Sequence, residues 1–359
     1  MAKKVVHVVG TGTIGEPLIG LLADFRSELG IDEVTFHKRS PLLTDRSKVQ
    51  NLIRRGARFV TDSKSFDGFR EIGLQPELET HEALDNADVV IDCTPSGVGQ
   101  SNKQEYYQRF EHNTLGFIAQ GSEFGFGKPY ARGINDAALE HGKDKYIQVV
   151  SCNTHNISVL IETVALADGG PDNLVSGRFV CIRRANDISQ DSSFVPAPEV
   201  GGHKDPRFGT HHARDAWHLF HTLGYDFDVY SSALKLNTQY MHTIWFSIVV
   251  RNPLSVDDVV DRMRANDRVA LTYKKSAGTV FSFGRDHGHY GRILNQTVVP
   301  HKTLAVRERD DGHEVVGFCF TPQDGNALLS SVAAACWFLD PETYDKRIQA
   351  LRSLFFEEV

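Results

Sequence analysis

One cysteine of this sequence has the surroundings of a nucleophile. Cys152 follows an apolar run, Tyr146–Val150, that is typical of a buried strand, and precedes the dense apolar spacing of a buried helix. Asn153, Thr154 and Asn156 are residue types that begin helices, so the thiol is expected at a strand-to-helix junction. The helix dipole and its unpaired backbone N–H groups lower a thiol pKa. The same N–H groups could hold an oxyanion after the sulfur adds to a carbonyl.

The other four cysteines have apolar neighbours, and we expect them to be buried structural thiols, the common fate of a cysteine. They are Cys93, Cys181, Cys319 and Cys336. Cys152 alone has polar residues on both sides, which favours a nucleophile over a packing role. Five cysteines in no regular pattern also indicate a reducing compartment.

The composition limits the classes of protein that need to be considered. A chain of 359 residues suggests about two domains, and 41% hydrophobic residues can fill their cores. The net charge of −7 is spread along the chain, which disfavours a nucleic-acid partner. No apolar run approaches the ~20 residues that span a bilayer. Lys3 and Lys4 lead straight into a strand and leave no room for a signal peptide, so we expect a cytoplasmic protein.

A glycine-rich loop near the start of the chain predicts a dinucleotide site. It lies between a short strand, Val5–Val9, and a helical stretch from Glu16 to about Leu29. In this setting the glycines allow a tight turn and the close approach of a pyrophosphate to the helix N-terminus. The residues expected to contact the cofactor are Gly10, Gly12, Thr13, Ile14 and Gly15.

The end of the second strand, Glu33–His37, bears on cofactor choice. A carboxylate at this point usually accepts hydrogen bonds from the ribose of NAD, but none is present here. Lys38, Arg39 and Ser40 follow instead, and they could bind a 2′-phosphate through charge-assisted hydrogen bonds. The alternative is that these residues are solvated loop positions. We expect NADP to be preferred, with NAD still usable.

Two further strand ends are expected beside the same cofactor. Ala87–Cys93 and Gly116–Ala119 are typical of buried parallel strands, and ligands of such sheets lie at the carboxyl ends of the strands. The loops that follow these strands provide Thr94, Pro95, Gly97, Gln120 and Gly121. Since Cys152 follows the next strand, this topology predicts a reactive thiol near a bound dinucleotide.

The pattern changes after the Cys152 helix. Strand-like runs follow at Arg178–Arg183, Asp226–Lys235, Thr243–Val250 and Val315–Phe320, and then a buried helix at Ala327–Leu339. The expected fold is α/β, with an N-terminal Rossmann dinucleotide-binding domain and an α+β catalytic domain whose sheet is mainly antiparallel. We expect domains at 1–151 and 152–325, with the C-terminal helix of about 326–359 returning to the first.

Several motifs together resemble the archaeal-type (type II) phosphorylating glyceraldehyde-3-phosphate dehydrogenases. Besides the glycine loop they are Asp92–Gly99 with Asn102-Lys103, Gln120-Gly121, Ser151–Thr154, Ile182–Ala185, His211-His212 and Thr238–His242. The resemblance extends over roughly residues 5 to 250. It implies a homotetramer that uses NADP or NAD, a phosphorylated aldehyde and inorganic phosphate.

The resemblance also implies residue roles. Cys152 forms a thioester with the aldehyde, and His242 removes the proton as hydride leaves. The residues expected to contact the substrate are Ser151, Asn153, Thr154, Arg183, His211 and His212. Arg184 and Gln323 are assigned to the cofactor. As alternatives, His242 could be a satisfied core histidine, and either arginine could form a surface ion pair.

Departures from the family pattern leave other functions open. His155 and Asn156 replace the usual continuation of the cysteine motif, Ile244 replaces a second histidine, and residues 276–321 match poorly. A related thiol-dependent semialdehyde or acyl-phosphate dehydrogenase is therefore the alternative enzyme. A non-catalytic dinucleotide-binding redox sensor is the alternative outside enzymes. A zinc site among the histidines is disfavoured, because no cysteine or acidic ligand has matching spacing.

Overall fold

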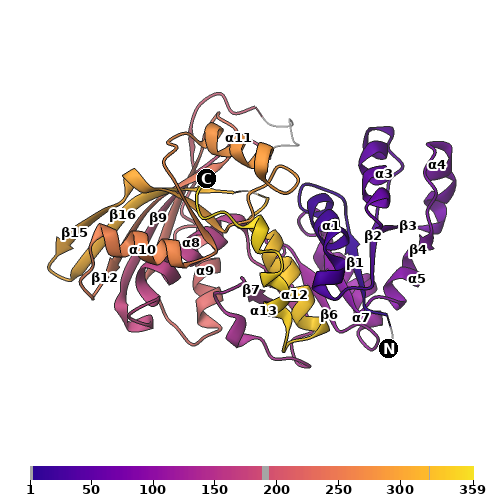
Figure 1. Cartoon of the computed structure of the whole chain (residues 1–359), viewed down its shortest axis with the longest axis horizontal. Coiled ribbons are helices and arrows are strands. Elements are labelled where there is room, and N and C mark those ends of the chain that lie inside the picture. Colours follow the sequence, from indigo (N-terminus) through magenta and orange to yellow (C-terminus); the bar gives the residue numbers. More distant parts are fainter. Residues whose placement is uncertain (1–2, 188–193, 323) are drawn as a thin grey trace. The chain divides into compact units, whose positions relative to one another are not determined.

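The chain forms two compact units, each built from separate stretches of sequence. The computed structural model describes residues 3–187, 194–322 and 324–359 (Figure 1). The first unit consists of Met1–Arg132, Leu139–Val149 and Leu328–Arg352. The second consists of Gly133–Ala138, Val150–Ala327 and Ser353–Val359. We retain cofactor binding by residues 1–151 and catalysis by residues 152–325 as a proposal.

The first unit contains a parallel sheet in the order β4-β3-β2-β1-β5-β6-β8-β7. The strand order reverses between β1 and β5, which places a topological switch point at their carboxyl ends. In chain order the strands are β1 (Val5–Val9), β2 (Glu33–His37), β3 (Arg58–Thr61), β4 (Leu78–Glu79), β5 (Val89–Asp92), β6 (Gly116–Ala119), β7 (Lys128–Tyr130) and β8 (Tyr146–Val149).

Helices pack against this parallel sheet and bury its apolar strands. Helix α1 contacts β1 and β2, α3 contacts β3, and α12 packs against β5, β6 and β8 (Figure 1). Every residue of α12 is buried, since its sequence is apolar on all sides. The helices of this unit are α1 (Gly15–Asp24), α2 (Arg26–Leu29), α3 (Arg46–Arg54), α4 (Phe66–Glu71), α5 (Thr80–Asp85), α6 (Val98–Asn102), α7 (Gln108–Phe110), α12 (Leu328–Leu339) and α13 (Tyr344–Gln349).

The second unit contains a mixed sheet in the order β10-β11-β9-β12-β16-β14-β13, with β15 paired to β16. β11 with β9 and β13 with β14 run parallel, and the remaining neighbours run antiparallel. The strands are β9 (Leu174–Arg183), β10 (Glu199–Val200), β11 (Val229–Lys235), β12 (His242–Val250), β13 (Val269–Thr272), β14 (Thr297–Pro300), β15 (Ala305–Arg309) and β16 (Gly312–Thr321).

Helix α8 covers the middle of this second sheet. It contacts β9, β14 and β16 and packs against α9. Its partner strands bring distant residues together: His242 pairs with Thr321, and Ile244 lies between Cys181 and Cys319. The helices of this unit are α8 (Cys152–Ile161), α9 (His211–His221), α10 (Val256–Ala265) and α11 (Ala277–His287).

The end of the chain belongs to the second unit. The Leu271 backbone N–H donates to the carbonyl of Glu357 at 3.0 Å, and the Val359 N–H donates back to the Leu271 carbonyl at 2.9 Å. The last residues therefore run alongside β13 in a parallel direction.

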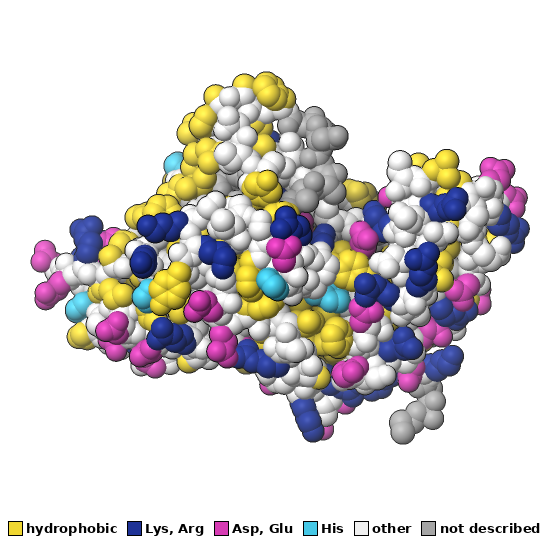
Figure 2. Space-filling model, turned by 45° about the horizontal axis from the view of Figure 1, so that its top comes forward, with side chains coloured by type: hydrophobic (Ala, Val, Ile, Leu, Met, Phe, Trp, Pro, Cys, Tyr) yellow, Lys and Arg dark blue, Asp and Glu magenta, His cyan; other side chains and the backbone are white. Residues whose placement is uncertain are grey.

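The expected fold class is confirmed. A Rossmann-type parallel sheet and a second, mainly antiparallel sheet are both present. In the described part of the chain, no helix combines the length and the apolar character needed to cross a bilayer. Acidic and basic side chains alternate over the face drawn in Figure 2, in keeping with the dispersed charge of the sequence.

Candidate active site

Cys152 is the first residue of helix α8, which spans Cys152–Ile161. The helix therefore begins earlier than the cap-type residues after Cys152 suggested, and Ser151 is its N-cap. The Ser151 hydroxyl accepts from the Thr154 backbone N–H at 3.4 Å, and the His155 Nδ1 lies 3.1 Å from the Ser151 carbonyl. Ser151 and Thr154 thus have a capping role, which takes the Thr154 N–H away from the expected oxyanion site.

The thiol of Cys152 is not activated in the way the sequence suggested. Cys152 is half-buried, and burial raises the pKa of its thiol to about 12. The Asp324 carboxylate raises this pKa further, whereas Arg184 and a hydrogen bond from the Asn153 backbone N–H lower it. The expectation of a lowered thiol pKa is therefore wrong, because desolvation outweighs the helix terminus. The Cys152 carbonyl accepts from Asn326 Nδ2 at 2.9 Å.

His242 lies beside the start of α8 although it is 90 residues away in sequence. It is the first residue of β12, 5% exposed, and its Nδ1 lies 3.1 Å from Asn153 Oδ1. Burial lowers the pKa of the imidazole to about 3, and Arg184 and Arg183 lower it further. His242 is therefore neutral at pH 7 and has a ring nitrogen that can accept a proton.

A buried chain of amides and hydroxyls supports this contact; we call it the amide network. Asn156 Nδ2 donates to Thr321 Oγ1 at 2.7 Å, and the Thr321 hydroxyl donates to Asn153 Oδ1 at 3.3 Å. The Cys319 thiol donates to Asn156 Oδ1 at 3.2 Å. Asn153 is 1% exposed, and Asn156 and Thr321 are fully buried. Each step satisfies a polar group that burial would otherwise leave unpaired.

Arg184 is buried and held on several sides. Its guanidinium donates to the Tyr240 carbonyl at 2.8 Å and to Asp187 at 3.0 Å, and lies 3.7 Å from Asp324. Tyr240 has a φ of 84°, an unusual value for a residue with a side chain, two residues before His242. Arg184 therefore stabilises the turn that leads into β12, and its expected contact with a cofactor stays a prediction.

Arg183, at the end of β9, lies near His211 and His212, the first two residues of α9. Arg183 is exposed, and the two imidazole rings lie 3.9 Å apart between centroids. Burial lowers the pKa of both histidines, and Arg183 lowers each further. His212 Nε2 lies 3.5 Å from Asn153 Nδ2. Its Nδ1 is buried and has no hydrogen-bond partner among the described residues.

The glycine loop of the first unit has the geometry that a dinucleotide requires. Gly10 has a φ of +99°, and a Cβ there would lie 2.9 Å from the Cys93 carbonyl oxygen. A Cβ on Gly15 would lie 2.1 Å from the Gly10 oxygen, whereas one on Gly12 would meet nothing within 4 Å. Helix α1 has no side-chain cap at Ile14. Open backbone beside an uncapped helix start fits a pyrophosphate.

The loop after β2 carries a group of charges beside the glycine loop. Lys38 Nζ lies 2.6 Å from Asp45 Oδ2, and Lys48 Nζ lies 3.1 Å from Asp45 Oδ1. Lys48 also donates to the Thr11 carbonyl at 3.2 Å, which ties the group to the glycine loop. Arg39 is exposed, and no ion pair of Arg39 is found in the described part of the chain. The cations that could bind a 2′-phosphate are therefore present, and the Asp45 carboxylate lies between two of them, Lys38 and Lys48.

The remaining residues predicted to bind the cofactor take part in the loops of the first unit. Thr94 donates to Asp92 from its backbone N–H at 2.9 Å, and the Gly97 N–H donates to Glu123 at 2.6 Å. Gln120 is buried and donates to Ser331 at 3.1 Å. Pro95 and Gly121 lie in the same loops as these residues, after β5 and β6, and Ser40 lies in the loop after β2. Gln323 lies outside the described residues.

Some site residues were not identified from the sequence. Asp45 has a local signal, since it lies three residues before Lys48, its ion-pair partner, whereas Asn156 contacts the distant Thr321. Thr321 and Asp324 meet α8 only through the fold, so no local signal marks them.

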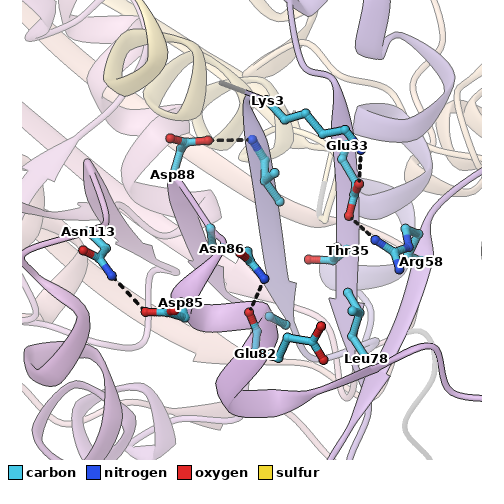
Figure 3. A pocket seen from close by; sticks show the side chains of 13 residues that line it. Lys3, Glu33, Thr35, Arg58, Leu78, Glu82, Asp85, Asn86, Asp88 and Asn113 are labelled. Atoms are coloured by element: carbon cyan, nitrogen blue, oxygen red, sulfur yellow. Dashed lines mark hydrogen bonds and ion pairs between the residues drawn. The ribbon is translucent and has the colours of Figure 1, made fainter. Parts of the chain in front are cut away.

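A further cavity of about 510 Å³ lies at the amino-terminal edge of the parallel sheet (Figure 3). Its charges pair with one another: Glu33 lies 2.7 Å from Arg58 and 3.4 Å from Lys3, and Asp88 accepts from the Val5 N–H at 2.7 Å. These contacts give it no feature that selects a ligand. Among the described residues, no group of three or more His, Cys, Asp or Glu side chains could hold a metal ion.

Comparison with curated proteins finds archaeal relatives of similar length, while no family model matches the chain. The chain is 27% identical over 302 residues to a glyceraldehyde-3-phosphate dehydrogenase of Methanobacterium formicicum, covering 81% of each protein. It is 27% identical over 309 residues to that of Sulfolobus acidocaldarius, covering 83% of this chain and 82% of the relative. It is 29% identical over 277 residues to that of Methanobacterium bryantii, covering 75% and 74%. The resemblance to the archaeal-type glyceraldehyde-3-phosphate dehydrogenases that the motifs indicated is therefore confirmed along most of the chain.

Proposed function

We propose that this protein is a thiol-dependent aldehyde dehydrogenase that converts glyceraldehyde 3-phosphate and inorganic phosphate to an acyl phosphate. The observation that carries the proposal is the contact of His242 with Asn153, the residue next to Cys152, at the start of α8 and within one compact unit. The names of the archaeal relatives support the choice of substrate. The dinucleotide supplies the hydride acceptor when it is bound.

The residues of the second unit suit each step of this chemistry. The Cys152 sulfur forms a bond to the aldehyde carbon, and a proton reaches the aldehyde oxygen, giving a hemithioacetal. His242 takes the hydroxyl proton while hydride leaves the same carbon, and a thioester results. A phosphate oxygen then attacks the thioester, the carbon–sulfur bond breaks, and the acyl phosphate departs. The Asn153 backbone N–H, which contacts the thiol, stabilises the negative charge that develops.

The proton positions in the free protein favour a dehydrogenase over a redox sensor. With a thiol pKa of about 12 and an imidazole pKa of about 3, Cys152 and His242 are both neutral at pH 7. A redox-sensing cysteine reacts as a standing thiolate, which these values disfavour. In a dehydrogenase the thiol loses its proton as the sulfur adds to the aldehyde, so a neutral resting state is compatible with turnover.

The group of Arg183, His211 and His212 is the best candidate for binding the substrate phosphate. Arg183 is exposed and can bind an anion through two parallel hydrogen bonds. The unpartnered Nδ1 of His212 offers a further donor once a ligand oxygen reaches it. Arginine recognises carboxylates in the same manner, so a semialdehyde dehydrogenase is the second candidate.

For the cofactor we propose a preference for NADP over NAD. Lys38 and Lys48 share Asp45, Lys48 contacts the Thr11 carbonyl of the glycine loop, and the exposed Arg39 follows Lys38. This arrangement supports a site for a 2′-phosphate. Asp45 weakens it, because the carboxylate already binds both lysines. We also propose, by resemblance to the relatives, a cytoplasmic homotetramer; sedimentation analysis of the purified protein tests the oligomeric state.

An aldehyde panel tests the proposed function. Purified protein is assayed with glyceraldehyde 3-phosphate, aspartate semialdehyde and an uncharged aldehyde, each with NADP and NAD, with and without inorganic phosphate. We expect phosphate-dependent reduction of the cofactor with glyceraldehyde 3-phosphate. Faster turnover of the semialdehyde would favour the second candidate. Cofactor binding without oxidation of any aldehyde would reject both.

A further inference from the structure

The side chain of Asn153 faces inward and not toward an open site. It is 1% exposed and contacts side chains from three other elements of the second unit. These are His242 at the start of β12, Thr321 at the end of β16, and His212 in α9. A side chain enclosed in this way cannot contact a substrate directly, so its amide must act, if at all, through its neighbours.

The amide network sets the orientation of the Asn153 side chain. Thr321 Oγ1 accepts from Asn156 Nδ2 at 2.7 Å, which directs the Thr321 hydroxyl proton toward Asn153 Oδ1. The Asn153 NH₂ then faces the His212 Nε2, where an acceptor is available. In this arrangement the oxygen of Asn153, not its nitrogen, faces His242.

An amide oxygen can only accept a hydrogen bond, and this decides where the proton of His242 lies. A neutral imidazole carries one N–H, so the 3.1 Å contact between Nδ1 and Asn153 Oδ1 requires the proton on Nδ1. The lone pair is then on Nε2. An amide acceptor also leaves the ring neutral, whereas a carboxylate at the same place would favour the imidazolium.

We propose that Asn153 is a positioning residue that holds His242 in the Nδ1–H tautomer, so that Nε2 is the proton acceptor of the active site. Asn156 and Thr321 act behind it by fixing the direction of its amide. The inference rests on the proposed function in one respect only, because the value of a free Nε2 is that it takes the substrate proton. The tautomer itself can be measured without turnover.

The first experiment reads the tautomer in the wild-type protein. Nitrogen-15 NMR of the histidine rings, with His242 assigned by comparison with His242→Asn, distinguishes a protonated Nδ1 from a protonated Nε2. We expect Nδ1 to be protonated and the ring to stay neutral from pH 8 down to pH 5, since its pKa is about 3. A protonated Nε2 in the wild type overturns the proposal, whether or not any aldehyde is oxidised.

The second experiment changes the acceptor. Asn153→Asp keeps an oxygen that accepts from Nδ1 but adds charge, so the pKa of His242 should rise by at least about one unit. The acid limb of kcat should then move upward in pH. Asn153→Leu removes the acceptor and should lower kcat by about 10-fold or more, with little change in KM.

Ser158→Ala is the matched control, because Ser158 is a fully buried polar residue of the same helix whose hydroxyl has no hydrogen-bond partner in the described structure. It should change neither kcat nor the titration of His242. If Asn153→Asp lowers the melting temperature but leaves the His242 titration of the folded protein unchanged, Asn153 is only structural and the proposal is wrong.

Discussion

The proposed catalytic site in the second unit and the glycine loop in the first unit differ in how their residues are held in place. In the second unit, Asn153 and His242, beside Cys152, are held by buried side chains that hydrogen-bond to one another in a chain. In the first unit, the glycine loop offers bare backbone, and its nearest charges, Lys38 and Lys48, are partly exposed. A change at one residue of a buried network affects its neighbours, whereas interactions of partly exposed cations are weakened gradually by salt.

The largest effect is expected from removing the thiol. Cys152→Ser should lower aldehyde oxidation by at least about 10⁴-fold, because a serine hydroxyl ionises far less readily than even this raised thiol. Cofactor binding and the melting temperature should stay close to wild type. The check is the turnover number together with a fluorescence titration of NADP. Appreciable residual turnover would mean that another residue is the nucleophile.

His242→Asn tests the base in the same network. Removing a general base typically lowers kcat by ~10²–10⁴-fold, and asparagine keeps a polar group where Nδ1 meets Asn153. Steady-state kinetics and a thermal melt, run on the same preparation, separate the two roles of this histidine. A loss of stability with an unchanged kcat would identify His242 as a core residue.

The raised thiol pKa predicts how Cys152 reacts when no ligand is bound. Since the thiolate forms only as the pH approaches about 12, alkylation by iodoacetamide should rise about tenfold per pH unit. It should show no plateau near 8.5, the ordinary thiol value. At pH 7 the rate should be at least ~10²-fold below that of an exposed cysteine. Mass spectrometry of the Cys152 peptide measures it.

A plateau of that alkylation rate below pH 8 would show a standing thiolate. Such a result would support the lowered thiol pKa that the sequence suggested. The thiol pKa would then no longer argue against a redox sensor.

The smallest effects are expected at the cofactor loop. The double variant Lys38→Ala/Arg39→Ala should reduce the ratio of kcat/KM for NADP over NAD by at least about 10-fold, since each charge-assisted hydrogen bond contributes ~1.5–3 kcal/mol. The ratio for the wild type should fall with added salt. Equal ratios in both proteins would show that these cations do not reach the 2′-phosphate.

Asp45→Asn should change the cofactor preference in the opposite direction to the double variant. The carboxylate now lies 2.6 Å from Lys38 and 3.1 Å from Lys48, and its loss should free both lysines for a phosphate. The NADP preference should rise a few-fold, while kcat with either cofactor stays the same. A fall in the preference would mean that Asp45 is needed to position the lysines.

Local patterns were sufficient to predict most of the fold. Val5–Val9, Glu33–His37 and Gly116–Ala119 were expected as strands and form β1, β2 and β6, because continuous apolar runs between turns suit a sheet covered on both faces. The start of α8 could not be placed from local sequence, since Ser151 and Asn153 are both good cap residues and only tertiary packing decides between them.

The electrostatics of the site could not be predicted from local sequence. The helix terminus at Cys152 is local and was recognised, but burial and Asp324 dominate the thiol pKa, and Asp324 is more than 100 residues away in the chain. Thr321 meets Asn153 and Asn156 only because β16 pairs with β12 below α8. Contacts between residues this far apart in the chain cannot be recognised from a single sequence.

Because each unit is built from separate stretches of sequence, neither unit is complete until a late part of the chain has been synthesised. The first unit lacks the α12 layer over β5 and β6 until residues 328–352 emerge, although its strands are made first. In the second unit, β13 can pair with β14, but the segment that hydrogen-bonds to its Leu271 is missing until residues 353–359 follow. Neither unit is complete before these segments are made, so nascent chains should expose apolar strands and engage chaperones until then.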